Sequence, residues 1–218
     1  IADHYTQIAS AIRGTIREKY WDATRGLFAD TYDHRSFSQH VNSLAILAGI
    51  VTGEEATRVM ERTLNDSSLI QATIYFRYYV HQALKVAGMG DHLLDNLQIW
   101  RDQMALGLTT WAEMPEPTRS DCHAWGASPN IEFFRILLGI DSNAPGFKSI
   151  RIAPSLGNLK EVSGTMPHPA GSVTASYKLD KKGKLTARLV LPAGTNGVFL
   201  WKGKEYQLKS GEQALTVE

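Results

Sequence analysis

A loop near the middle of the chain gathers side chains that could carry chemistry. Glu113 is a single carboxylate two residues after Trp111, and Arg119 and His123 follow it closely. A carboxylate can take a proton from water as a general base, and neighbouring cations help to keep it ionised near neutral pH. The spacing therefore suggests acid–base chemistry centred on Glu113. A solvated glutamate in an exposed loop would give the same pattern.

The residues that follow could bind a sugar. His123 could donate a hydrogen bond to a hydroxyl group, and the indole face of Trp125 could stack against the C–H groups of a sugar ring. A core histidine beside a core tryptophan is an equally good interpretation. Asp121 is better explained as a helix N-cap than as a sugar ligand. Arg119 could bind a hydroxyl group or simply pair with Glu116.

Two further clusters have ordinary structural explanations. Gln39 and Asn42 share one face of a predicted helix, where they could reach a substrate or else cap the helix and anchor a loop. The run from residue 75 to residue 79 contains three tyrosines and one phenylalanine. We expect this aromatic run to be part of the hydrophobic core.

Several classes of function are not supported. The seven histidines are scattered and the single cysteine, Cys122, has no companion, so no metal-ligand spacing is present. The sequence contains no phosphate-binding glycine loop, serine nucleophile elbow or dinucleotide fingerprint. A net charge of +1 without a basic stripe does not indicate nucleic-acid binding, and no apolar run reaches the roughly 20 residues of a membrane span. We therefore expect no cofactor and no metal.

The chain changes character near residue 140. Before that point, apolar residues recur at helical spacing and predict helices at residues 4–20, 37–51, 54–64, 69–87, 90–106 and 122–138. Asp91 is a candidate N-cap, and Pro129 marks either a kink or the start of a separate helix capped by Ser128. Short alternating runs then predict seven strands, at residues 147–152, 159–166, 173–179, 185–191, 198–201, 205–208 and 214–217. Such a set of strands suggests an antiparallel sandwich.

The central loop resembles a known family. Residues 109–113 read Thr-Thr-Trp-Ala-Glu, which fits a Thr-Thr-aromatic-x-Glu pattern, and residues 120–125 contain a Ser-x-x-His segment with a tryptophan nearby. This part is similar to the late catalytic region of bacterial α-L-rhamnosidases, glycoside hydrolase family 78. The resemblance covers nearly the whole chain. It is most specific at residues 109–139, next at 147–154, and weak over the last 20 residues.

The resemblance implies roles for individual residues. In that family the glutamate of the pattern is the general base, which assigns this role to Glu113. The residues placed around the substrate are then His123, Trp125, Trp111, Arg119 and Asp121. The implied reaction is the inverting hydrolysis of terminal α-L-rhamnosides, in which water activated by the base attacks the anomeric carbon opposite the leaving group. The general acid of the family belongs to an earlier part of its barrel, and no segment of this chain matches that motif.

The resemblance also implies an architecture of mixed α and β domains. Residues 1–140 would be the second half of an (α/α)6 toroid, and residues 141–218 a C-terminal antiparallel β-sandwich. We expect the chain, which begins at Ile1, to be the C-terminal fragment of a longer enzyme and to be inactive alone, because one carboxylate cannot act as both acid and base. Half a toroid would expose apolar helix faces. The expected partners are therefore a rhamnose-containing glycan or glycoside, and either the missing N-terminal half or a second copy of the chain.

Other interpretations stay open. The chain could be part of another (α/α)6 glycosidase or of a phosphorylase, although only Arg119 stands beside Glu113 to build a phosphate pocket. It could also be a non-catalytic carbohydrate-binding or scaffold piece, in which Trp111 and Trp125 hold a glycan and Glu113 is incidental. The sequence does not determine the linkage, the aglycone or the compartment. A periplasmic or extracellular location in a bacterium is compatible with the resemblance.

Overall fold

The computed structural model describes residues 1–218, which divide into two compact units. The first unit consists of residues 1–89 and 96–127, and the second of residues 90–95 and 128–218. Helices dominate the first part of the chain and largely antiparallel sheets the second, as the sequence predicts. The toroid, the sandwich and the domain ranges 1–140 and 141–218 stay predictions. None of the helices combines the length and the apolar character that crossing a membrane requires.

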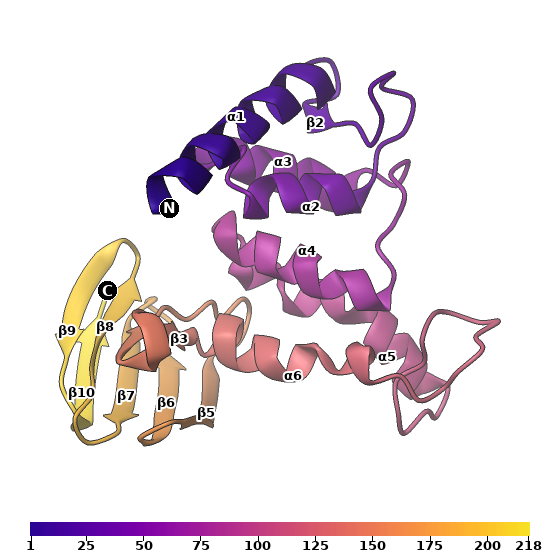
Figure 1. The fold of residues 1–218 in the computed structure, drawn as a ribbon. Coiled ribbons are helices and arrows are strands. Elements are labelled where there is room, and N and C mark those ends of the chain that lie inside the picture. Colours follow the sequence, from indigo (N-terminus) through magenta and orange to yellow (C-terminus); the bar gives the residue numbers. More distant parts are fainter. The chain divides into compact units, whose positions relative to one another are not determined.

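The first unit is built from helices, most of which contribute to one hydrophobic core. Their bounds are α1 Ala2–Tyr20, α2 Gln39–Leu47, α3 Gly53–Asn65, α4 Ile74–Val86 and α5 Gln98–Ala105. Figure 1 shows α2 beside both α3 and α4. On α3 the buried residues are Ala56, Val59, Met60 and Thr63, which recur every three or four positions. This spacing gives the helix one apolar face, and that face joins the core.

Two buried polar side chains hold the start of α2 in place. The side chain of Asn42 accepts a hydrogen bond from the Phe28 N–H at 2.8 Å and donates one to the Phe28 carbonyl at 3.0 Å. Phe28 ends a short hairpin formed by β1 (Trp21–Asp22) and β2 (Leu27–Phe28). Gln39 accepts the N–H of Ala72 at 2.9 Å and donates to the Thr63 carbonyl at 3.1 Å. Gln39 and Asn42 could either reach a substrate or anchor a loop, and these contacts support the anchoring role.

The second unit contains two four-stranded sheets. The first has the order β3-β4-β8-β9 and the second the order β10-β7-β6-β5. The strands are β3 Ile140–Ser142, β4 Ser149–Ile152, β5 Glu161–His168, β6 Gly171–Leu179, β7 Leu185–Leu191, β8 Asn196–Trp201, β9 Lys204–Leu208 and β10 Gly211–Val217. Buried side chains from both sheets, among them Ile150, Phe199, Tyr177 and Leu189, form one hydrophobic cluster. The alternation of buried and exposed residues along β7 is the period-2 pattern that predicts a strand.

One strand pair differs from the antiparallel prediction. β4 and β8 run parallel, with Ile150 opposite Gly197. Between them the chain forms β5, β6 and β7 of the other sheet, so it returns to β4 by a long crossover rather than by a hairpin. The register allows no side chain at Gly197, because a Cβ atom there would lie 2.3 Å from the Ile150 carbonyl oxygen.

The prediction for residues 90–106 is wrong in its first half. This stretch forms two 3₁₀ turns, Gly90–His92 (η1) and Leu94–Leu97 (η2), before α5 begins. Asp91 does not cap α5. Its side chain instead accepts the backbone N–H of Gly157 at 2.8 Å, within the second unit. A contact between residues so far apart in sequence leaves no local pattern.

The predicted helix 122–138 is divided into three pieces. They are a 3₁₀ turn at Ala124–Ala127 (η3), helix α6 at Pro129–Glu132 and a π-helical turn at Phe133–Leu137 (η4). Of the two interpretations of Pro129, the start of a separate helix is confirmed, since Pro129 occupies the first helical position. Ser128 occupies the N-cap position, but its side chain makes no capping hydrogen bond.

Candidate functional site

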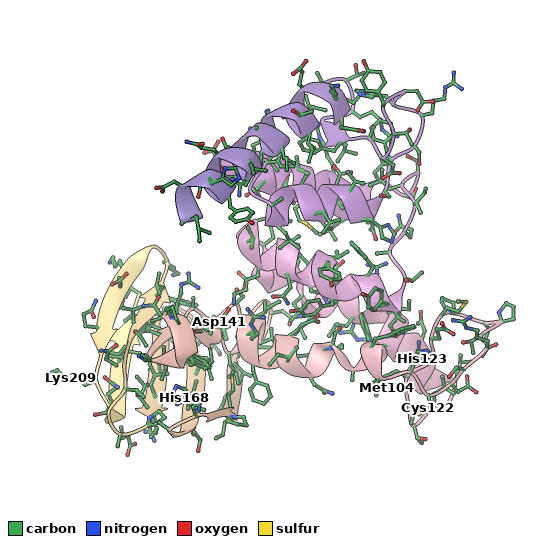
Figure 2. The ribbon with its side chains drawn as sticks, in the orientation of Figure 1. Met104, Cys122, His123, Asp141, His168 and Lys209 are labelled. Carbon is green, nitrogen blue, oxygen red and sulfur yellow. The ribbon has the colours of Figure 1, made fainter.

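The segment that follows α5 carries the candidate site, and it runs as a long loop until η3 (Figure 1). Two backbone hydrogen bonds fold this loop onto itself. The N–H of Glu113 donates to the Ser120 carbonyl at 2.9 Å, and the N–H of His123 donates to the Trp111 carbonyl at 2.7 Å. These bonds bring the two arms of the loop together, so that Glu113 and His123 become neighbours across it. Figure 2 labels His123 and Cys122 on this loop and Met104 on α5.

Helix α5 fixes both arms of the loop. The buried side chain of Gln103 accepts the N–H of Ala112 at 3.0 Å, directly before Glu113. The buried indole of Trp100 donates its N–H to the Gly126 carbonyl at 2.6 Å, directly after Trp125. Because the acceptor of the first bond, Gln103, and the donor of the second, Trp100, both lie on α5, this helix sets the spacing of the two arms that carry Glu113 and Trp125.

A close approach between Gly126 and Trp111 closes the base of the loop. A Cβ atom at position 126 would lie 2.4 Å from the Cβ atom of Trp111, which is closer than side-chain carbons can come. Only glycine therefore fits there without displacement of Trp111. Gly126 itself is buried. The tryptophan of the Thr-Thr-Trp-Ala-Glu pattern is in this way part of the support of the site, and it is half-buried.

Glu113 is the centre of the charged cluster. Only 5% of its side chain is exposed, and both of its carboxylate oxygens accept hydrogen bonds from the guanidinium group of Arg119. The Nε2 atom of His123 lies 3.9 Å from Oε1 of the same carboxylate. The hydrogen bonds from Arg119 lower the pKa of Glu113 below its usual 4.5, although partial burial acts in the opposite direction. The carboxylate is therefore ionised at neutral pH.

An ionised, mostly buried carboxylate can still act as a base while it is paired. A carboxylate has about four lone-pair positions, and a bidentate arginine occupies only two of them. A water molecule can use another. The side chain of Arg119 is 77% exposed, so its pairing with Glu113 is partly screened by solvent and salt. The pair thus combines a sheltered carboxylate with a cation that remains accessible from outside.

The predicted substrate-binding residues fall into two groups. Trp125 is 40% exposed and its ring lies 4.3 Å from the ring of His123, so these two side chains form a surface next to Glu113. The Nδ1 atom of His123 is buried and has no hydrogen-bond partner. Asp121 is exposed, and its backbone carbonyl accepts the hydroxyl group of Thr110 at 2.6 Å. No contact of its side chain joins it to Glu113.

Two of the local interpretations are wrong. Asp121 is not the N-cap of the following helical turn, because η3 begins only at Ala124. Arg119 pairs with Glu113 and not with Glu116, whose carboxylate accepts the N–H of Thr118 at 3.1 Å. Both errors have the same cause, because the fold of the loop back onto itself determines which groups these two side chains can reach.

Sequence reasoning missed the supporting residues. Gln103 and Trp100 look like ordinary residues of an amphipathic helix, and only their contacts with the loop reveal their role. A buried glutamine inside a predicted helix is the one signal that could have indicated it, since buried amides need hydrogen-bond partners.

Comparisons with known proteins find one matching family model and several similar solved structures. Residues 139–215 match the family model of the bacterial alpha-L-rhamnosidase C-terminal domain. No match was found among curated proteins. A family 78 rhamnosidase from Bacillus sp. GL1 is 26% identical over 91% of this chain and 24% of its own, with a TM-score of 0.74.

Two further solved structures share the fold. An α-L-rhamnosidase from Aspergillus terreus is 17% identical, with a TM-score of 0.81 over 99% of this chain and 27% of its own. An α-L-rhamnosidase from Streptomyces avermitilis, solved in complex with L-rhamnose, is 17% identical, with a TM-score of 0.78 over 100% of this chain and 24% of its own. The chain thus spans about a quarter of the length of these proteins.

Proposed function

We propose that this chain, which resembles the C-terminal part of family 78 α-L-rhamnosidases over nearly its whole length, supplies the general base of an inverting α-L-rhamnosidase. The observation that carries the proposal is the environment of Glu113. Its carboxylate is 5% exposed, held ionised by Arg119 and placed 3.9 Å from His123. A base for water needs a free lone pair, a low fraction of protonated carboxyl and a fixed position, and Glu113 combines all three.

The proposed reaction begins when Glu113 takes a proton from a water molecule. The water oxygen attacks the anomeric carbon of a terminal α-L-rhamnoside while the bond from that carbon to the leaving-group oxygen breaks. A second carboxyl group, outside this chain, protonates the leaving-group oxygen. Trp125 offers its exposed indole to the sugar ring, and His123 lies between this indole and the base.

The likeness of fold supports a proposed architecture. The helical part of the chain would form the second half of an (α/α)6 toroid, and the two four-stranded sheets a β-sandwich. Since the chain covers about a quarter of the rhamnosidases that it matches, the general acid would come from the rest of such a protein. We therefore expect the chain alone to release no product from an aryl α-L-rhamnoside.

Binding of L-rhamnose to the 218-residue chain tests the proposal without requiring turnover. Saturation-transfer NMR and calorimetry should detect L-rhamnose, with D-glucose as the control sugar. Trp125→Ala should weaken the binding strongly, whereas Glu113→Gln should retain most of it, because a base contributes more to the transition state than to the bound sugar. Equal losses in both variants would instead indicate a carbohydrate-binding surface without a base.

A turnover assay supplies the second arm of the test. The chain is incubated with 4-nitrophenyl α-L-rhamnoside, and release of the nitrophenolate is followed over hours. We expect no signal above that of the Glu113→Gln variant. Turnover that disappears in Glu113→Gln would show that a single chain holds both the acid and the base, and would contradict the assignment of the acid to another segment.

A further inference from the structure

The net charge of the whole chain conceals an uneven distribution of charge. Residues 141–218 contain eleven lysines and arginines against six aspartates and glutamates, which gives this part a net charge of +5. The whole chain has a net charge of +1, so residues 1–140 carry −4. Nine of the eleven cations in the β part are lysines. The fold decides whether these lysines are scattered or brought together.

Two turns of the second unit bring five lysines to one end of its sheets. One turn joins β6 to β7, the other joins β8 to β9, and the two hairpins belong to different sheets. A Cβ atom at Gly183 in the first turn would lie 3.9 Å from the Nζ atom of Lys202 in the second, so the turns are adjacent. We call the five residues the lysine cluster: Lys181, Lys182, Lys184, Lys202 and Lys204.

The ammonium groups of the lysine cluster are exposed and unpaired. All five residues are exposed, and none of them forms a salt bridge. The acid within the first turn, Asp180, uses its Oδ1 atom to accept the backbone N–H groups of Lys182 at 2.8 Å and Lys184 at 2.9 Å. That carboxylate therefore shapes the turn. The other acids at this end of the sheets are Glu161, which pairs with Lys178 at 3.9 Å, Glu205, which accepts the side-chain amide of Gln207, and Glu218.

The backbone of Lys202 adds a second observation. Lys202 has a φ of 46° and Gly203 a φ of 78°, so both central residues of the β8–β9 turn are left-handed. Asparagine and glycine adopt this conformation at lower cost than lysine, and Asn-Gly is the preferred pair in such a turn. The turn thus keeps a cation at a position that the local backbone does not favour, which points to a use for its charge.

We propose that the lysine cluster is a docking surface for an anionic polysaccharide whose sugars carry carboxylates. Lysine ammonium groups are flexible point charges that pair with spaced carboxylates one at a time, whereas the planar fork of arginine suits bidentate binding of phosphates. The cluster contains lysines and no arginine. A glycan is also the polymer on which the proposed function acts, and this one reason rests on that proposal.

The surroundings of the cluster disfavour two other polyanions. Single-stranded nucleic acids stack their bases on exposed aromatic rings, but no aromatic residue of the range 141–218 is exposed. Trp201, next to the cluster, is half-buried, and its ring lies 5.8 Å from the Lys202 ammonium group. Binding to a membrane surface uses exposed apolar side chains as anchors. The one exposed large apolar residue in this range, Val190, lies towards the other end of β7, since Leu185 is the residue that borders the turn.

The test measures the binding of fluorescent decagalacturonate to the 218-residue chain by anisotropy. The affinity should fall at least about tenfold between about 50 and 200 mM NaCl, because binding releases several counterions. A neutral galactan decasaccharide should not bind. Lys182→Glu combined with Lys202→Glu, one change in each turn, should weaken binding at least about tenfold, since each lysine near an anionic surface contributes a several-fold factor. The corresponding pair of changes to glutamine should give a smaller loss in the same direction.

The matched control reverses two charges at the opposite end of the β3-β4-β8-β9 sheet. Lys148 precedes β4, whose first residue pairs with the first residue of β8, and Lys209 follows the end of β9 that pairs with Gly197 (Lys209 is labelled in Figure 2). Lys148→Glu combined with Lys209→Glu changes the net charge by the same amount. It should alter the affinity by less than about twofold, because charges beyond a Debye length of about 10 Å are largely screened.

Three outcomes overturn the inference. They are the absence of decagalacturonate binding, equal losses in the cluster and control variants, and tighter binding of decathymidylate or phosphatidylserine vesicles than of decagalacturonate. L-Rhamnose binding separates this inference from the proposed function. The cluster variants should bind L-rhamnose as the native chain does. A native chain that binds decagalacturonate but not L-rhamnose would contradict the proposed function and leave the docking surface in place.

Discussion

The guanidinium group of Arg119 holds both carboxylate oxygens of Glu113, although the first side chain is 77% exposed and the second only 5%. The Arg119 side chain is thus largely in contact with solvent, whereas the Glu113 side chain is enclosed by the protein. This asymmetry means that Arg119 can be changed with little effect on packing. The consequences of such a change should then be mainly electrostatic.

Arg119→Ala should raise the pKa of Glu113, because hydrogen bonds from Arg119 are the main cause that lowers it. Titration of the Glu113 side-chain carboxyl carbon by NMR measures the change directly. Arg119→Lys should have a smaller effect, since an ammonium group cannot form the bidentate pair. Arg35→Ala, which removes an exposed arginine paired with Asp33, is the matched control and should leave the titration unchanged. An unchanged pKa in Arg119→Ala would show that another group keeps Glu113 ionised.

The same pair predicts a pH dependence of stability. The pKa of Glu113 is lowered in the folded chain, so the carboxylate stabilises the fold above its unfolded pKa, and this contribution is lost as the pH falls through the folded value. The free energy of unfolding of the native chain should therefore decrease below pH 4.5 more steeply than that of Glu113→Gln. Denaturant titrations at a series of pH values test this, and parallel curves for the two proteins would contradict it.

Gln103→Ala should loosen the arm of the loop that carries Glu113. The variant removes the side-chain oxygen that accepts the Ala112 N–H. Because Ala112 is buried, its N–H then lacks a partner, and such an unpaired donor lowers the free energy of unfolding by about 1–3 kcal/mol. Amide hydrogen exchange at Ala112 should accelerate accordingly. Gln98→Ala on the same helix breaks only an exposed bond to Asp102 and should leave the exchange at Ala112 unaffected. If the Ala112 amide were equally protected from hydrogen exchange in both variants, Gln103 would not be needed to hold the loop.

Gly126→Ala should disturb the loop by steric contact alone. The new methyl group would meet the Cβ atom of Trp111 at 2.4 Å, and overpacking of this kind costs about 1–3 kcal/mol. Urea denaturation should report the loss, and the exchange of the His123 N–H should become faster. Gly14→Ala is the counterpart, because nothing lies within 4 Å of that position in α1, and alanine there should stabilise the helix by roughly 1 kcal/mol.

Tyr177→Phe should destabilise the second unit. The Tyr177 hydroxyl is buried between the sheets and donates to the Leu138 carbonyl at 2.8 Å, and the loss of such a bond costs about 1–3 kcal/mol when the acceptor stays buried. Tyr206→Phe is a suitable comparison. Its ring contacts the same Phe199 at 6.2 Å, against 6.3 Å for Tyr177, yet Tyr206 is only half-buried. Similar denaturation midpoints for the two variants would count against a structural role of the Tyr177 hydroxyl.

The sequence by itself determined the features that depend on neighbours along the chain. Helical periodicity and strand alternation divide the chain correctly into a helical part and a part built of sheets, and Pro129 marks the start of a short helix. The association of Glu113 with Arg119 and His123 also follows from their closeness within one loop. Such patterns are readable because they repeat over a few residues or require only a short chain closure.

The tertiary structure decided every feature that joins distant segments. It attached Asp91 to Gly157 instead of to a helix start, placed β8 parallel to β4, and used Gln103 to fix the loop that carries Glu113. It also exposed Tyr75 beside Trp125, although a run of aromatic residues suggests a core. Whether an aromatic ring is buried or presented to a ligand depends on which other elements pack against it, and that packing leaves no periodic signal in the sequence around the ring.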